Sequence, residues 1–170
     1  MDRSSTPCDA SRRRLLAARD ARQEHLDAAV REARGGVVAL SLAIPGADKA
    51  PRGADALFSW AAVRVAEAFA DARAVHAGVD ALGPFALWDV GLAPAAAKAA
   101  CVAIEASRAA ARLLDLDVYS PEGAALDRAA LGLPPRRCLC CDAPARECIA
   151  LRRHSTDELA RSALLLLAAP

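Results

Sequence analysis

The feature of this sequence that most constrains the fold is the strict alternation in Leu114-Asp115-Leu116-Asp117-Val118. Successive side chains of a β-strand point to opposite faces, so the apolar residues share one face and the two carboxylates share the other, about 7 Å apart. The pattern predicts a strand over 113–119 with one buried face. Two carboxylates at this spacing, with arginines nearby, favour a Mg²⁺ site and phosphate chemistry. The alternative is the solvated face of an edge strand.

Length and composition restrict the classes of function. A chain of 170 residues is long enough for one domain with its own hydrophobic core. The formal net charge of +1 provides no overall basic field for nonspecific nucleic-acid binding. Aromatic residues make up only 4% of the chain, too few for a platform on which bases stack. We therefore expect no nucleic-acid partner and assign anion recognition to local clusters of arginine.

Neither end of the sequence predicts a membrane segment. Residues 1–14 are charged and lack the apolar core of a secretory signal. The apolar run over 163–169 is far shorter than the roughly 20 residues that span a bilayer. We therefore expect a soluble, cytoplasmic protein with no membrane partner, in which the six cysteines are reduced thiols or metal ligands.

Helical and strand patterns mix without a regular β-α-β order. Residues 1–10 are expected to be disordered. Helices are expected over 11–34, 53–77 and 94–110, and strands over 37–44, 85–90, 113–119 and 124–128. The predicted fold class is α+β, with a small, mostly antiparallel sheet flanked by helices and a Cys/His-rich helical appendage at the C-terminus. We expect a catalytic domain over 11–133 and, within the same domain, a Cys/His-rich segment over 134–170.

Polar residues on the expected helices need separate interpretation. Arg19 and Arg22 interrupt the inward stripe of the first helix, which otherwise consists of Leu15, Leu26, Ala29 and Ala33. They either extend past the core edge and pair with Asp20 and Glu24, or reach into an anion site. His76 is expected at the end of the second helix. Lys98 and Glu105, seven residues apart, share one face of the third.

A cluster of metal-type ligands lies near the C-terminus. Cys138 and Cys141 form a C-x2-C motif, followed by Cys148 and His154. Three thiolates and one imidazole complete a tetrahedral Zn²⁺ site of the structural kind. Cys140 is an additional thiol inside the motif. The alternative is that the cysteines are small buried hydrophobes and the histidine caps a helix.

From Lys98 to about Leu159 the sequence resembles the citrate lyase holo-acyl-carrier-protein synthases, also called apo-citrate lyase phosphoribosyl-dephospho-CoA transferases. The matching residues are, in order, Arg112-Leu-x-Asp115-x-Asp117-Val118, Ser120-Pro121-Glu122-Gly123, Leu133-Pro134-Pro135-Arg136-Arg137-Cys138-x-x-Cys141, Cys148 and His154. The segments Leu15–Gln23 and Ile44–Lys49 are also similar. Family members usually carry His-Pro-Leu-Gly before the motif arginine, where this sequence has Arg108-Ala109-Ala110-Ala111. Loss of the glycine is expected to alter the backbone just before Arg112.

The resemblance implies a nucleotidyltransferase reaction. The family takes 2′-(5″-triphosphoribosyl)-3′-dephospho-CoA, transfers its phosphoribosyl-dephospho-CoA group to a serine of the acyl carrier (gamma) subunit of citrate lyase, and releases diphosphate. The attacking hydroxyl belongs to the partner, so the chain needs no nucleophile of its own. Two other functions stay open: the same transfer to a malonate decarboxylase carrier, and a non-catalytic, zinc-stabilised interaction module whose acidic strand binds a basic partner.

The resemblance also implies roles for individual residues. Asp115 and Asp117 hold Mg²⁺, and one of them receives the serine proton. Guanidinium groups match phosphate oxygens, so the leading phosphate ligands are Arg112, Arg136 and Arg137. The second-rank candidates are Arg19, Arg22 and Lys49, and Glu105 is a candidate third carboxylate. Zinc at the cysteine cluster would fix Arg136 and Arg137 relative to the acidic strand. The alternative for the arginines is surface ion pairing.

Overall fold

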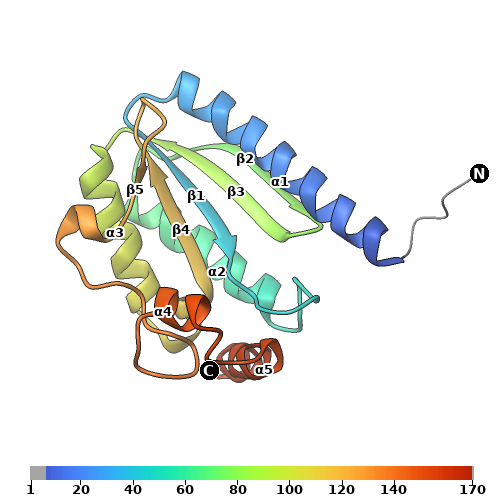
Figure 1. Cartoon of the computed structure of the whole chain (residues 1–170). Helices are drawn as coiled ribbons and strands as arrows, with labels where there is room; N and C mark the ends of the chain where they lie inside the picture. Colours follow the sequence, from blue (N-terminus) through green and yellow to red (C-terminus); the bar gives the residue numbers. More distant parts are fainter. Residues whose placement is uncertain (1–6, 170) are drawn as a thin grey trace, which may run out of the picture.

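The computed structural model describes residues 7–169, in which five strands form one sheet (Figure 1). The strands are β1 (Gly36–Leu42), β2 (Arg73–Asp80), β3 (Gly83–Val90), β4 (Leu114–Tyr119) and β5 (Ala125–Leu126). They are arranged in the order β2-β3-β1-β4-β5, and every neighbouring pair is antiparallel. This confirms the predicted α+β class with a small antiparallel sheet.

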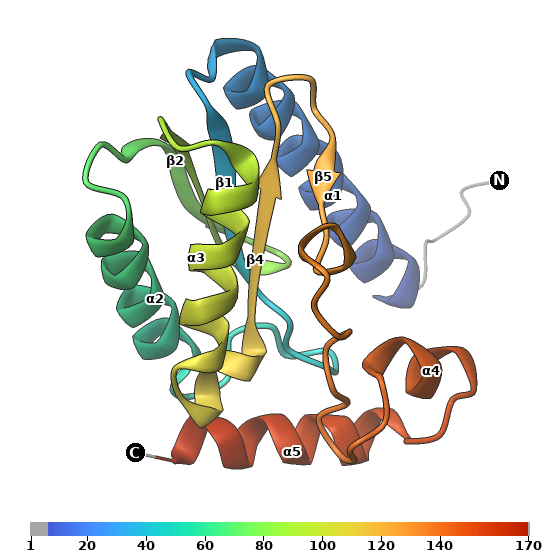
Figure 2. The same cartoon turned by 90° about the vertical axis from the view of Figure 1, so that its left-hand side faces the viewer.

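The described residues also form five α-helices. They are α1 (Pro7–Glu32), α2 (Ala54–Ala68), α3 (Pro94–Ala106), α4 (Ala145–Ala150) and α5 (Thr156–Ala168), with 3-10 turns η1 (Ala109–Leu113) and η2 (Ala129–Leu131). Figures 1 and 2 show α2 and α3 on one face of the sheet and α1 on the other. Within the described residues, no helix has both the length and the apolarity needed to cross a membrane.

The central strand β1 is buried on both faces, which separates the core into two parts. Leu40 and its alternate neighbours pack with α2, α3, β4 and η1 in the larger part. Val37 and Ala39 pack with Leu26 and Ala29 of α1 in the smaller part. Residues of α5 close the end of the larger core, where Ala163 is buried. The Cys/His-rich segment is therefore joined to the core of the sheet through α5.

The N-terminal helix begins earlier than the sequence pattern indicated. Residues 7–10 are helical, so the expected disorder over 1–10 is wrong for this part, and residues 1–6 lie outside the described residues. A proline at the first position of a helix costs no hydrogen bond, and Asp9 in the first turn interacts favourably with the helix dipole. These two residues favour a start at Pro7 rather than at Ser11.

The expected helix over 53–77 is wrong beyond Ala68. Phe69 has an extended backbone, and residues 73–80 form the edge strand β2, which pairs with β3. Most of β2 is exposed, so its sequence carries no period-2 alternation of apolar residues. Pairing with the buried strand β3 therefore decides its conformation. His76 consequently lies in a strand, where its ring stacks on that of His25 with 3.8 Å between centroids.

Two further boundaries differ from the expected ones. The helix expected over 94–110 ends at Ala106, and residues 109–113 form the 3-10 turn η1 instead. The strand expected over 124–128 has only two paired residues, Ala125 and Leu126. Short pairing of β5 leaves most of one edge of β4 without a neighbouring strand.

Candidate functional site

Charged side chains take the place of a neighbouring strand along the open edge of β4. The Leu116 N–H donates to the Glu105 carboxylate at 3.1 Å, and the Leu116 carbonyl accepts from Lys98 Nζ at 2.8 Å. The Leu114 carbonyl accepts from an Arg136 guanidinium nitrogen at 2.8 Å. Buried backbone polar groups need partners, so this edge collects charged groups beside the acidic pair.

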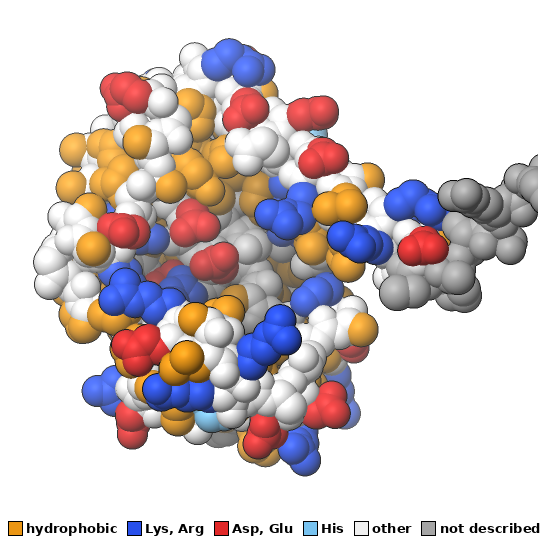
Figure 3. Space-filling view, in the orientation of Figure 1, with side chains coloured by type: hydrophobic (Ala, Val, Ile, Leu, Met, Phe, Trp, Pro, Cys, Tyr) orange, Lys and Arg blue, Asp and Glu red, His pale blue; other side chains and the backbone are white. Residues whose placement is uncertain are grey.

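Asp115 and Asp117 point away from the larger core, as their alternation predicted. Ser41 and Ala39 of β1 lie opposite them in the sheet register. The carboxylate side chains are 44% and 46% exposed, and they line two adjoining cavities of about 200 and 340 Å³. Figure 3 shows this face hollowed, with acidic side chains near its centre and Lys and Arg side chains around them. Both carboxylates can therefore reach a ligand in the hollow.

Each carboxylate of the pair has its own basic neighbour. Arg136 lies 3.3 Å from Asp115, and Lys98 lies 3.8 Å from Asp117. Arg136 also pairs with the buried Glu105, which Arg128 approaches to 3.4 Å on its other oxygen. The site thus combines three carboxylates with three cations in one network.

Burial and mutual repulsion shift the pKa of two of the acids. Burial raises the pKa of Asp117, and the charge of Asp115 raises it further against the opposing effect of Lys98. Burial also raises the pKa of Glu105, although Arg136 and the Leu116 N–H favour its ionised form. A cation shared by Asp115 and Asp117 would relieve the repulsion that raises the pKa of Asp117.

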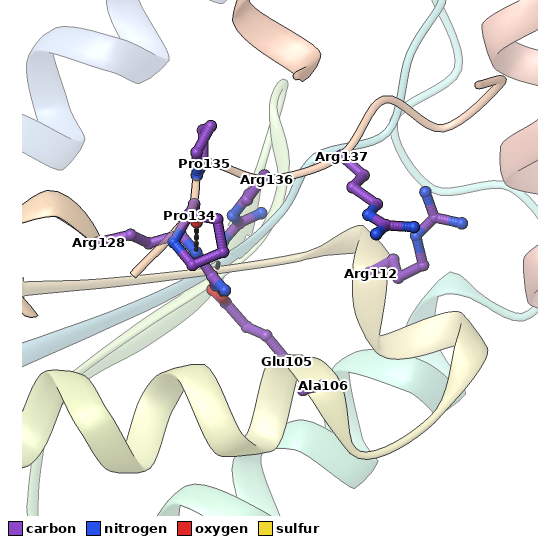
Figure 4. A pocket seen from close by; sticks show the side chains of 8 residues that line it. All are labelled: Glu105, Ala106, Arg112, Arg128, Pro134, Pro135, Arg136 and Arg137. Atoms are coloured by element: carbon purple, nitrogen blue, oxygen red, sulfur yellow. Dashed lines mark hydrogen bonds and ion pairs between the residues drawn. The ribbon is translucent and has the colours of Figure 1, made fainter. Parts of the chain in front are cut away.

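Arg112 and Arg137 form the other part of the site. Both line a cavity of about 300 Å³ together with Glu105, Arg128 and Arg136, and Figure 4 shows the Arg137 guanidinium turned toward that of Arg112. Arg112 donates to the Cys138 carbonyl at 2.6 Å and forms no ion pair with any described residue. Arg137 is 72% exposed and its ionic partner is a solvent-exposed aspartate. Two cations in one cavity wall suit a multiply charged anion.

The second-rank candidates have different surroundings. Pairing of Arg22 with Asp20 or Glu24, one of the two alternatives left open by the sequence, is not seen: its guanidinium bonds both oxygens of Asp80 at 2.7 Å. Arg19 and Arg22 both line the recess that contains Asp115 and Asp117. Lys49 donates to the Ile44 carbonyl at 2.8 Å within its own loop. Its role as a phosphate ligand stays a prediction.

Sequence reasoning assigned no role to several residues of the site. Lys98 and Arg128 contribute cations, and Ser41 lies opposite Asp115 on β1. The seven-residue spacing of Lys98 and Glu105 was the one available signal, because it places both on the same face of α3. Nothing in the sequence alone indicated that this face meets the open edge of β4.

The ligand atoms of Cys138, Cys141, Cys148 and His154 all lie within 4.8 Å of one another. The Cys141 and Cys148 sulfurs are 3.5 Å apart, and His154 Nε2 is 3.3 Å from the Cys141 sulfur. Tetrahedral Zn²⁺ with bonds of about 2.3 Å to sulfur places its sulfurs about 3.8 Å apart. The residues present therefore fit a metal ion such as zinc.

The local structure explains how these four residues meet. Cys138 and Cys141 lie in a tight loop in which the Cys140 N–H faces the Cys138 sulfur at 3.5 Å. Cys148 comes from α4, and His154 precedes the capping box that begins α5. Cys140 points away to Ser162 of α5, 3.2 Å distant, so the additional thiol of the motif lies outside the ligand set.

Comparison with known proteins gives a family. A sequence model of the CitX family, described as apo-citrate lyase phosphoribosyl-dephospho-CoA transferase, matches residues 10–168. Proteins of the same name from Escherichia coli O9:H4 (strain HS) and Shigella boydii serotype 18 (strain CDC 3083-94 / BS512) are each 39% identical over 89 residues. The alignment covers 52% of this chain and 49% of each relative. The chain thus spans about half the length of the curated relatives it matches.

Proposed function

The chain belongs to the apo-citrate lyase phosphoribosyl-dephospho-CoA transferase family, and on that premise we propose that it is an enzyme that attaches this prosthetic group. The donor is 2′-(5″-triphosphoribosyl)-3′-dephospho-CoA and the acceptor is a serine of the citrate lyase acyl carrier (gamma) subunit. Diphosphate is the second product, which makes the reaction a nucleotidyltransfer.

The observation that carries the proposal is the junction of the acidic pair with the arginine cavity. Arg136 contacts both parts, because its guanidinium lies 3.3 Å from Asp115 and it lines the cavity of Arg112 and Arg137. A triphosphate bound by the arginines would present its α-phosphorus to the carboxylates. In phosphoryl and nucleotidyl transfer, positioning and charge neutralisation supply most of the catalysis.

Asp115 and Asp117 would hold Mg²⁺. Their fit rests on the donor set of two carboxylates, which Mg²⁺ prefers, and on burial and the charge of Asp115, which raise the pKa of Asp117 and which a shared cation would offset. The ion would neutralise charge on the phosphates when bound. Arg112, Arg136 and Arg137 would bind the phosphate oxygens, with Arg19, Arg22 and Lys49 in a secondary role and Glu105 fixing Arg136.

The nucleophile would come from the carrier. Its serine oxygen forms a bond to the α-phosphorus, the bond between that phosphorus and the bridging oxygen of the β-phosphate breaks, and diphosphate leaves. The serine proton passes to one of the two carboxylates, Asp115 or Asp117, both of which line the same recess. Burial and the two aspartates raise the pKa of Tyr119 in the same recess, which keeps this hydroxyl protonated.

A structural Zn²⁺ would be held by Cys138, Cys141, Cys148 and His154. Residues 134–170 then form one part of the domain that also includes residues 11–133, because they supply two phosphate-binding arginines and the metal ligands. Reduced thiols in this role agree with a cytoplasmic protein.

Mass spectrometry of the purified carrier tests the function. The carrier is incubated with this protein, Mg²⁺ and the triphosphoribosyl donor, and a mass gain at one serine with equimolar diphosphate is expected. Transfer restricted to a malonate decarboxylase carrier would correct the partner. Tight binding of the carrier without release of diphosphate would contradict the enzymatic function and favour a non-catalytic interaction module.

A further inference from the structure

A larger cavity adjoins the arginines on the side away from the acidic pair. It has a volume of about 820 Å³ and lies between the segment that follows β1, the loop of Cys138, and helices α4 and α5. Arg112, Arg136 and Arg137 line it and also line the 300 Å³ cavity beside Glu105. The two cavities therefore meet at the residues that would bind phosphate.

The lining of the larger cavity combines apolar and cationic side chains. Its apolar residues include Ile44, Leu139, Ile149 and Leu159. Ile149 is 73% exposed in the lining of this cavity, so its side chain is accessible to a ligand there. The volume lies in the range of sites that enclose small molecules or cofactors. An amphipathic ligand with an apolar body and phosphate groups matches such a lining.

Two arginines of this cavity lack a carboxylate partner. Arg112 and Arg152 form no ion pair with any described residue, and they lie in its wall together with Arg137. The N-terminus of α5 is not an alternative anion site here, because the Glu158 carboxylate already accepts the Ser155 N–H at 2.8 Å. Phosphate groups in the cavity would therefore meet guanidinium groups.

We propose that this cavity binds the dephospho-CoA part of the donor, with its adenosine against the apolar wall. The inference rests on the proposed function, which places the triphosphate at the shared arginines. In that donor only one ribosyl unit separates the triphosphate from the adenosine, so the adenosine must lie in a neighbouring site. Arg152 is then the ligand of the diphosphate that joins the adenosine to pantetheine. With few aromatic residues in the chain, aliphatic side chains and guanidinium planes supply the surface for the base.

The test uses the full, metal-bound chain and dephospho-CoA as the probe in isothermal titration calorimetry. Leu159→Trp fills the cavity from α5, and we expect it to weaken binding at least about tenfold. Leu165→Trp introduces the same side chain on the same helix at a position 74% exposed and outside the cavity lining, and it should bind like wild type. Ile149→Asp, at an exposed position, places a carboxylate near the phosphates and should weaken binding without affecting folding.

The outcomes separate this inference from the function on which it rests. Wild-type affinity for dephospho-CoA in both Leu159→Trp and Ile149→Asp would overturn the inference. If the enzyme is active, a KM for the donor that is unchanged in both variants would overturn it as well. If both variants lose affinity while no carrier is ever modified, the cavity assignment stands and the proposed transfer fails.

Discussion

Glu105 accepts the backbone N–H of Leu116, the residue between the two aspartates, at 3.1 Å. The same carboxylate pairs with Arg136, which reaches Asp115. Lys98, seven residues before Glu105 on α3, bonds the carbonyl of Leu116. Helix α3 thus completes the hydrogen bonding of β4 where no strand does, and the same side chains fix the cations of the site. The contacts that complete the edge of β4 therefore also position the charged groups of the candidate site.

We first predict that Glu105→Ala destabilises the protein by about 3–5 kcal/mol, because it leaves the buried Leu116 N–H without an acceptor and removes the buried ionic partner of Arg136. Glu105→Gln retains an acceptor for Leu116 and should lose less. Urea unfolding measures both. Glu67, an exposed residue paired with Arg64, provides the control: Glu67→Ala should change the free energy of unfolding by no more than about 0.5 kcal/mol. Equal, small effects at Glu105 and Glu67 would argue that Glu105 does not stabilise the open edge of β4.

If the proposed function holds, Asp115→Asn and Asp117→Asn should each abolish transfer, with losses of about 100-fold or more in kcat, since both remove a charged ligand of the proposed Mg²⁺. Circular dichroism and melting temperature should show an intact fold. Asp55→Asn, at an exposed position of α2, is the matched control and should keep full activity. Transfer near the wild-type rate in either active-site variant would end the Mg²⁺ assignment.

The raised pKa of Asp117 predicts a further effect of Asp117→Asn on stability. A raised folded-state pKa favours the protonated form, so this contribution to stability is complete below the ordinary aspartate pKa of about 3.9 and is lost as the pH rises through the folded value. Near neutral pH the charged carboxylate therefore costs folding free energy. Without Mg²⁺ the asparagine variant should melt at the wild-type temperature or above it, and this advantage should vanish in acid. A melting temperature of Asp117→Asn below that of wild type near neutral pH would contradict the raised pKa of Asp117.

The metal group predicts different behaviour for neighbouring cysteines. Cys148→Ser removes one of four ligands, so the purified protein should contain less than about a tenth of an equivalent of zinc and melt at a lower temperature. Cys140→Ser, in the same loop, changes a thiol that contacts Ser162 and should retain about one equivalent. Elemental analysis of protein purified without affinity-tag histidines measures both. A wild-type protein that folds normally with almost no metal would eliminate the site.

The acidic strand and the cysteine cluster could be predicted from the sequence because both depend on local spacing. Alternation placed Asp115 and Asp117 on one face whatever the rest of the fold, and four ligand residues within 17 positions can meet without a long-range contact. The edge strand β2 could not be predicted in the same way. Its residues are mostly exposed, and the segment before it is rich in alanine. Only pairing with β3 therefore distinguishes strand from helix.

The charge network could be predicted only in part. Arg136 was assigned from its motif, but its link to Glu105 depends on how α3 packs beside β4. The partner of Arg22 was missed for a related reason: Asp80 ends strand β2, and sequence reasoning had assigned the first part of this strand, up to residue 77, to a helix. Long-range ion pairs follow from the topology of the sheet, which the local pattern does not contain.

Arg112 provides the last prediction, because it connects the proposed phosphate cavity to the Cys138 loop through its 2.6 Å bond to the Cys138 carbonyl. Arg112→Lys retains the charge but loses the planar fork, so it cannot bond that carbonyl and a phosphate at the same time. We expect the donor KM and the inhibition constant for diphosphate each to rise about tenfold, since bidentate contacts to phosphate are replaced by a point charge. Arg108→Lys is the control: Arg108 lies over the Trp60 ring at 5.1 Å and outside the cavity of Arg112. Product inhibition by diphosphate that is unchanged in Arg112→Lys, or equally weakened in Arg108→Lys, would remove Arg112 from the phosphate site.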